Sequence, residues 1–192
     1  MSPVPALEQA LVALRCTPGA VVLVDGRSGT GKSTFAAALA ARGRATLLRL
    51  DDVYPGWDGL EAASAALVPQ VLLPRRRGEP GTIRRWDWLG GAPGGTLVVG
   101  AARPLVVEGC GAITAASAPY AALSVWFELP GPERRRRALD RDGDAYAPHW
   151  ERWARQERLA IARARPRALA DLVVDGSTFP PSLLSASTGG VQ

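Results

Sequence analysis

The stretch of this sequence that decides its fold is Gly26-Arg27-Ser28-Gly29-Thr30-Gly31-Lys32-Ser33, followed by Thr34. It fits the pattern G-x-x-x-x-G-K-[ST] at every required position. The glycines let the backbone curl, so that successive N–H groups turn inward toward phosphate oxygens. The Lys32 ammonium would neutralise the β and γ phosphates, and the Ser33 hydroxyl would reach Mg²⁺. We therefore predict that residues 26–34 hold the phosphates of a nucleotide.

The flanking sequence has the form that such a loop requires. Residues 20–24 are a continuous apolar run, as expected of a buried parallel strand. Residues 32–42 are alanine-rich and predict a helix that stops at Gly43. The N-terminus of this helix would turn the positive end of its dipole toward the phosphates. Residues 46–50 then predict a second strand.

The rest of the chain alternates between the two kinds of element. Helices are predicted at 5–15, at 60–73 with a break at Pro69, at 133–139 and at 148–163; strands are predicted at 96–99, 105–107, 123–129 and 172–174. Residues 74–95 are rich in Gly, Pro and Arg and indicate a loop with a short extended segment at 83–88. The alternation predicts a three-layer α/β/α fold with a mostly parallel sheet.

We expect one domain over residues 1–184, including a small arginine-bearing lid at about 131–147 that breaks at Asp142-Gly143-Asp144. Pro180-Pro181 would open a short closing segment, and residues 185–192 would form a flexible tail.

Composition narrows the class of protein. The 192 residues are 47% hydrophobic, without an apolar run of the roughly 20 residues that span a bilayer, and no basic, signal-like N-terminus is present. Two cysteines without ligand spacing fit a reducing, cytoplasmic setting. The net charge of +5 comes from dispersed arginines, because Lys32 is the only lysine. No nucleic-acid-binding motif accompanies them, so nucleic acid is not the expected partner.

Carboxylates follow two predicted strands. Asp51 and Asp52 come after residues 46–50, and Glu108 ends an apolar run in the manner of a Walker B strand. Carboxyl ends of parallel strands meet at one edge of the sheet, beside the phosphate loop. Such groups can accept the proton of an attacking hydroxyl or hold Mg²⁺, so Ser33, Asp52 and Glu108 are the metal candidates. As an alternative, Asp51 or Asp52 could cap a turn or helix. Glu108 could likewise be a charged loop residue without a catalytic role.

Arginines and aromatic residues supply further candidates. Arg134, Arg137 and Arg141 have near-helical spacing and could close over phosphates, or form a solvated face. Tyr54 and Trp57 lie on a loop near the carboxylates and could form an acceptor platform. Asp87, between Trp86 and Trp88, could bind a sugar or base, although the two tryptophans could equally be packing residues. We interpret His149 as structural.

The phosphate loop alone does not define the reaction. A GTPase would normally carry N-K-x-D, which a chain with one lysine, Lys32, cannot contain, and the L-S-G-G-Q signature is also missing. The length is that of a compact nucleoside or nucleotide kinase.

On these motifs the chain resembles the uridine kinase-like and phosphoribulokinase-like branch of P-loop kinases. The resemblance covers residues 20–142 and includes, besides the loop, Asp51-Asp52-Val53-Tyr54, Val107-Glu108-Gly109 and Arg134-x-x-Arg137-x-x-x-Arg141-Asp142. It implies ATP and Mg²⁺ as cofactors, Asp51 as the catalytic base and Arg137 and Arg141 as lid residues. It also implies that the loop after the last strand, 171–175, packs near the adenine.

The resemblance has one departure. The His-Pro-x-x-Phe-Asp segment with which uridine kinases read uridine is absent, and residues 84–88 stand in its place. The predicted activity is transfer of the γ-phosphoryl group of ATP to a hydroxyl of a nucleoside-like acceptor. One alternative is a nucleoside monophosphate kinase, using Arg75-Arg76-Arg77 or Arg84-Arg85 for the acceptor phosphate. Another is a regulatory ATPase without a small acceptor. The acceptor, the choice of ATP or GTP, and the oligomeric state stay open.

Overall fold

The predicted phosphate loop joins strand β1 (Val21–Gly26) to helix α2 (Lys32–Gly43) in the computed structural model, which describes residues 1–178. All six residues of β1 are buried, as its apolar sequence requires. The closing segment at Pro180-Pro181, the tail at 185–192 and the predicted domain end at 184 lie outside the described residues.

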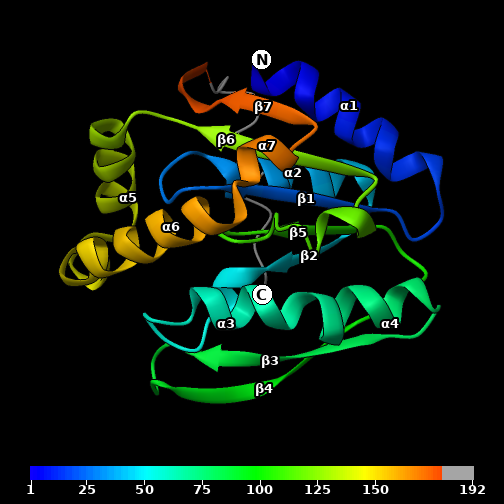
Figure 1. Ribbon diagram of the computed structural model, residues 1–192, viewed down its shortest axis with the longest axis horizontal. Helices are drawn as coiled ribbons and strands as arrows, with labels where there is room; N and C mark the ends of the chain where they lie inside the picture. The colour runs from blue at the N-terminus through cyan, green and yellow to red at the C-terminus, as the bar shows by residue number, and fades with distance from the viewer. Residues whose placement is uncertain (179–192) are drawn as a thin grey trace.

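Five parallel strands form the main sheet, in the order β2-β5-β1-β6-β7 (Figure 1). Besides β1 they are β2 (Thr46–Arg49), β5 (Leu105–Glu108), β6 (Leu123–Glu128) and β7 (Leu172–Asp175). The register pairs Val24 of β1 with Glu108 of β5, so Glu108 ends its strand beside the start of the phosphate loop. This is the parallel-sheet α/β fold that the sequence predicts.

Alternate residues of β1 build the cores on the two faces of the sheet. Val22 and Val24 pack with the buried faces of α1 (Pro3–Cys16) and α2, and Val21 and Leu23 pack with α3 (Leu60–Leu67) and α6 (Trp150–Ala164). The three-layer prediction is thereby confirmed.

The helix predicted at 60–73 is confirmed, and its break has a defined form. α3 passes into a π-helical turn at Val68–Leu72, which contains Pro69, and continues as α4 (Leu73–Arg76). Proline removes one helical N–H donor, and a wider turn accommodates that loss.

Residues 74–95 are more regular than the sequence interpretation has them, although the extended segment expected at 83–88 and the strand expected at 96–99 both overlap observed strands. They contain most of an antiparallel hairpin, β3 (Gly81–Asp87) and β4 (Ala92–Val99), which forms a separate two-stranded sheet beyond α3 and α4 (Figure 1). Only Gly81, Ile83 and Val99 of its residues are buried. The hairpin therefore lacks the apolar alternation by which a strand is found in a sequence.

The lid region is more helical than predicted. α5 spans Gly131–Tyr146 rather than 133–139, and its helical geometry is interrupted at Gly143, which has φ 54° and ψ −137°. The break predicted at 142–144 is therefore present, but the chain resumes a helix after it. A short 3-10 turn, Ala147–His149, leads into α6, and α7 (Pro166–Leu169) precedes β7. α5 and α6 lie at the carboxyl end of the sheet (Figure 1).

None of the helices in residues 1–178 is long and apolar enough to cross a membrane.

Candidate active site

The phosphate loop has the left-handed backbone that its glycines allow. Gly29 has φ 83° and Gly31 has φ 95°, a region that side chains disfavour. A Cβ atom at Gly29 would also overlap the backbone carbonyl of Arg134 on α5. Inside the loop, Thr30 Oγ1 donates to the carbonyl of Arg27 at 2.8 Å. The loop is thus closed on itself and fits tightly against α5.

Lys32 is buried, with 5% of its surface exposed, at the first turn of α2. Burial alone would lower the pKa of this ammonium, but the acidic groups around it, Glu108 and Asp51 among them, raise it above its ordinary value. Lys32 therefore keeps its positive charge, as a phosphate-binding lysine must.

Glu108 is the carboxylate best suited to hold a metal. Its Oε2 accepts a hydrogen bond from Ser33 Oγ at 3.2 Å, while its buried Oε1 has no hydrogen-bond partner within residues 1–178. Burial raises the pKa of Glu108, and Lys32 and Ser33 oppose that shift. An orphaned buried oxygen beside a hydroxyl fits Mg²⁺, which usually binds through one or two carboxylates, waters and the substrate phosphates. In the described part of the chain no cluster of three or more His, Cys, Asp or Glu could hold a metal alone.

Asp51 and Asp52 lie on a 3-10 turn, Leu50–Asp52, at the end of β2. The Asp51 side chain is exposed, and its negative charge acts on Lys32 and on Arg141. Asp52 is half-buried. The structure therefore brings the predicted base to the carboxyl edge of the sheet, near the lysine and the lid.

The two lid arginines are paired within or near α5. Arg137 donates to Glu133 at 2.8 Å and to the carbonyl of Gly176, in the turn after β7, at 2.9 Å. The exposed Arg141 pairs with Asp142, which raises its pKa. Arg134, which we predicted to close over phosphates with them, is instead buried, and its guanidinium donates to the carbonyls of Leu129 and Ser28.

The predicted acceptor residues differ in their surroundings. Tyr54 is a correction: its ring is buried, it packs edge-on against Trp153, and its hydroxyl donates to the carbonyl of Cys110 at 2.8 Å. Asp87 is exposed and its Oδ1 accepts the N–H groups of Leu89 and Gly90. It therefore caps the β3–β4 turn. The burial of Tyr54 overturns its assignment as a substrate contact, whereas that of the exposed Asp87 stays a prediction.

Trp57 is the predicted acceptor residue that lies within an aromatic cluster, and its ring also stacks on that of Tyr146 with centroids 5.5 Å apart. It is half-buried, stacks on His149 with centroids 4.2 Å apart, and lies 4.9 Å from the ring of Trp88. Trp88 Nε1 donates to the carbonyl of Asp51 at 2.7 Å. The aromatic cluster of Trp57, Trp88 and His149 thus contacts the backbone of the predicted base, Asp51. His149 is part of this packing.

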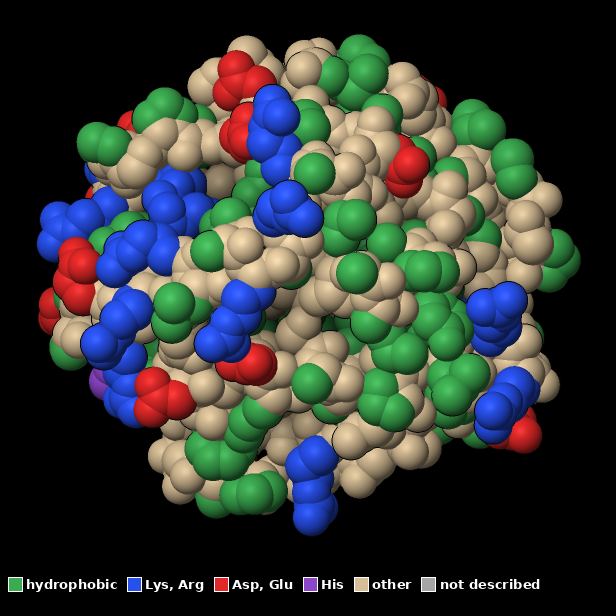
Figure 2. Space-filling model, viewed as in Figure 1, with side chains coloured by type: hydrophobic (Ala, Val, Ile, Leu, Met, Phe, Trp, Pro, Cys, Tyr) green, Lys and Arg blue, Asp and Glu red, His purple; other side chains and the backbone are tan. Residues whose placement is uncertain are grey.

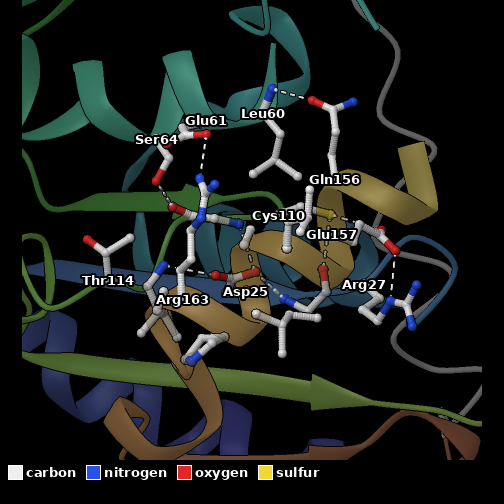
Figure 3. Close-up of a pocket in the computed structure, with 18 of the residues that line it drawn as sticks. Asp25, Arg27, Leu60, Glu61, Ser64, Cys110, Thr114, Gln156, Glu157 and Arg163 are labelled. Carbon is white, nitrogen blue, oxygen red and sulfur yellow. Dashed lines mark hydrogen bonds and ion pairs between the residues drawn. The ribbon is translucent and has the colours of Figure 1, made fainter. Parts of the chain in front are cut away.

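Asp25, at the end of β1, is a site residue that the sequence interpretation missed (Figure 3). Its Oδ1 accepts the N–H groups of Gly26 and Gly111, at 2.6 and 3.2 Å, and its Oδ2 accepts that of Ile113 at 2.9 Å. Complete burial raises the pKa of Asp25 to about 7, and these hydrogen bonds oppose the shift. The sequence feature that could have identified Asp25 is its position directly before Gly26, as the one charged residue in an otherwise apolar strand.

Glu157 of α6 is the second missed residue. It is 2% exposed, its Oε1 accepts the N–H of Ser28 at 2.6 Å, and its Oε2 pairs with Arg27 at 2.8 Å. Nothing in the sequence indicated that a glutamate about 130 residues away would contact the phosphate loop.

A cavity of about 400 Å³ lies between α3 and α6, next to Gly26 and Arg27 (Figure 3). Leu60, Ile113 and Trp126 are among its apolar walls, and Arg163 and Glu61 form an ion pair at it. The surface outside carries basic side chains over α5 and α6 (Figure 2). Acidic side chains lie among them, because Glu133, Asp140 and Asp142 pair with arginines of α5.

Comparison with known proteins supports the fold. No protein-family model matches the sequence, and no curated protein is significantly similar to it. Among solved structures, a protein described as a possible uridine kinase from Bacillus stearothermophilus is 17% identical, with a TM-score of 0.64, over 90% of this chain and 97% of that one. A protein from Silicibacter sp. TM1040, described as a "putative fructose transport system kinase", is 22% identical, with a TM-score of 0.56, over 90% of this chain and 98% of that one. The sheet order and these likenesses give the chain the fold of P-loop kinases.

Proposed function

We propose that this protein is an ATP-dependent phosphotransferase that moves the γ-phosphoryl group of ATP to a hydroxyl of a small acceptor. The observation that carries the proposal is a buried, charged Lys32 within the electrostatic influence of Glu108, whose Oε1 lacks a partner among the described residues. A glycine-rich loop, an ammonium and a carboxylate with a free oxygen are what a magnesium–triphosphate complex requires.

Each part of the site has a role in this reaction. The loop amides and Lys32 hold the phosphates and neutralise the charge that develops on them. Asp51 accepts the proton of the acceptor hydroxyl while the new O–P bond forms and ADP leaves with the old bridging oxygen. Ser33 and Glu108 would hold Mg²⁺, with Asp52 nearby, and the ion would supply further neutralisation of phosphate charge. Arg137 and Arg141 are the arginines available to close over the phosphates.

A nucleoside-like acceptor is the finer part of the proposal. The ring of Trp88 is hydrogen-bonded to the backbone of Asp51 and packs against Trp57, and aromatic faces bind bases or sugars by stacking. This arrangement favours a planar or ring-shaped acceptor whose hydroxyl approaches Asp51.

The alternative of a nucleoside monophosphate kinase loses one of its two arginine groups. Arg75 on α4 is buried and donates to the carbonyls of Gly19 and Arg103, which precede β1 and β5. It therefore lies at the opposite edge of the sheet from the phosphate loop. Arg84 and Arg85 on β3 are exposed and keep this alternative testable.

A transfer assay with labelled ATP and Mg²⁺ tests the proposal. We would compare nucleosides, nucleoside monophosphates, other small alcohols and no acceptor. Label transferred to a nucleoside supports the proposal, and transfer only to monophosphates favours the alternative. Hydrolysis that no acceptor changes would favour a regulatory ATPase.

Asp51→Asn tests the assigned base in the same assay. We expect kcat to fall by about 10²- to 10⁴-fold, the usual contribution of general-base catalysis, with ATP affinity retained. Asp52→Asn is the matched variant, because it changes the neighbouring carboxylate. Full activity of Asp51→Asn with a loss in Asp52→Asn would transfer the role to Asp52.

A further inference from the structure

Ser28, in the phosphate loop, is held at all three of its polar groups by residues from α5 and α6. Its N–H donates to Glu157 at 2.6 Å, its carbonyl accepts from Arg134 Nη1 at 3.2 Å, and its hydroxyl bonds Tyr146 at 3.0 Å. Ser28 itself is buried. The shape of the loop therefore depends on the lid region and on the helix that follows it.

Glu157 is the least expected of these partners, because it lies on the apolar face of α6. Trp150, Trp153 and Ala154 share that buried face at helical spacing, while Glu151 on the same helix is exposed. A carboxylate in such a place is costly unless its charge and lone pairs are satisfied.

The surroundings of Glu157 satisfy its charge with groups of the site. Arg27 Nε pairs with its Oε2 at 2.8 Å, Arg134 Nη1 lies 3.9 Å from the same oxygen, and the Cys110 thiol contacts Oε1 at 3.4 Å. Figure 3 shows Glu157 reaching from α6 toward Arg27 and Cys110. One carboxylate thus connects α6 with the backbone and the arginine side chain of the phosphate loop.

We propose that Glu157 is a positioning residue for the phosphate loop. By fixing the Ser28 peptide and Arg27 in one orientation, it holds the following amides, 29–33, in the arrangement that phosphates need before ATP arrives. A preorganised loop loses less conformational freedom on binding, so its affinity is higher. The inference rests on the proposed function, because it assigns Glu157 to the binding of ATP.

Three variants of the full chain test this role. Glu157→Ala removes the acceptor of the Ser28 N–H and the charge. Glu157→Gln keeps an acceptor oxygen and the size of the side chain but removes the charge. Glu151→Gln makes the same chemical change at the exposed position of α6 and is the control. Binding is measured by titration with a fluorescent ATP analogue and Mg²⁺, and circular dichroism reports whether each variant is folded.

We expect Glu157→Ala to weaken the analogue at least about tenfold, as the loss of a hydrogen bond to a charged group implies. Glu157→Gln should weaken it less, roughly threefold, because its amide oxygen still accepts the Ser28 N–H. Glu151→Gln should match the wild type. In the transfer assay, KM for ATP should rise while kcat at saturating ATP stays near the wild-type value, a pattern that general destabilisation does not produce.

Two results would overturn the inference. Folded Glu157→Ala with unchanged affinity would show that the loop keeps its shape without this contact, and tighter binding would show that the carboxylate competes with ATP. If Glu157→Ala does not fold, the affinity of Glu157→Gln is the test instead. Wild-type affinity in that variant would also show that the loop does not depend on the Glu157 carboxylate. A wild-type protein that binds no analogue overturns the proposed function together with this inference, whereas binding by the wild type separates the two.

Discussion

Lys32 is buried and positively charged, so its substitution tests directly whether this ammonium binds phosphate. Lys32→Met keeps most of the side-chain volume but removes the ammonium that we propose binds the phosphates. We expect ATP affinity to fall at least about tenfold and phosphoryl transfer to be lost, since charged hydrogen bonds contribute about 1.5–3 kcal/mol. Nucleotide titration and the transfer assay measure both effects. Arg42→Met, on the exposed side of the same helix, is the control, and equal affinity in the two variants would exclude Lys32 from phosphate binding.

Asp25 predicts a pH dependence of stability. Its pKa is about 7 in the folded protein against the ordinary 3.8 of an aspartate carboxyl, so the unfolded chain releases this proton at lower pH than the folded chain. Between these values the folded state binds more protons, and the free energy of unfolding falls as pH rises. Asp25→Asn should remove that part of the slope, on the order of 3 kcal/mol between pH 5 and 8.

Urea denaturation of wild type and Asp25→Asn at several pH values measures this difference. Asp144→Asn, which changes an exposed carboxyl on α5, serves as the control. Parallel stability curves for the wild type and Asp25→Asn would contradict the prediction.

At the scale of elements, Gly143 is the residue at which the helical geometry of α5 is interrupted. Its backbone angles, φ 54° and ψ −137°, are open to glycine but strained for other residues, at a cost of about 1–3 kcal/mol. Gly143→Ala should lower the free energy of unfolding by that amount, although no atom within 4 Å would obstruct the new Cβ. Gly131→Ala, in the first turn of the same helix and without left-handed backbone, should be nearly neutral. Equal denaturation midpoints for the two variants would contradict this prediction, because they would show that position 143 does not require the left-handed backbone of glycine.

The elements that the sequence predicts well are those whose signals are local. The apolar run of β1, the glycines of the loop and the alanine-rich α2 each carry their own signature, and Glu108 is found because it ends such a run. The sequence predicts only parts of the β3–β4 hairpin, the extended segment at 83–88 and the strand at 96–99. It does not predict their pairing, because most of the hairpin residues are exposed and only Ile83 and Val99 of its apolar residues are buried. Tyr54 was misplaced and Glu157 missed for one reason: contacts between distant segments decide both positions, and local sequence does not encode them.

At the scale of the whole molecule, a ligand that binds only the folded state must stabilise it. The phosphate loop contacts α5, α6 and the turn after β7, so ATP bound there would hold together segments that are distant in the chain. At a Mg·ATP concentration 100 times its Kd, the gain is about 2.7 kcal/mol, which raises the Tm of a protein of this size by roughly 5–10 °C. Thermal unfolding with and without Mg·ATP measures this, and Lys32→Met should show little shift. An unchanged Tm in the wild type would contradict nucleotide binding.

The burial of Lys32, the single lysine of the chain, has a practical consequence for chemical labelling. An amine-directed reagent has only two targets in this protein, the terminal amino group and the Lys32 ammonium. The terminal group is exposed and should react in every state, so it acts as an internal standard within each molecule. Because Lys32 is buried and keeps its proton, it should react far more slowly than the terminal group, and a second modification, read from the intact mass, would report opening of the structure around the phosphate loop.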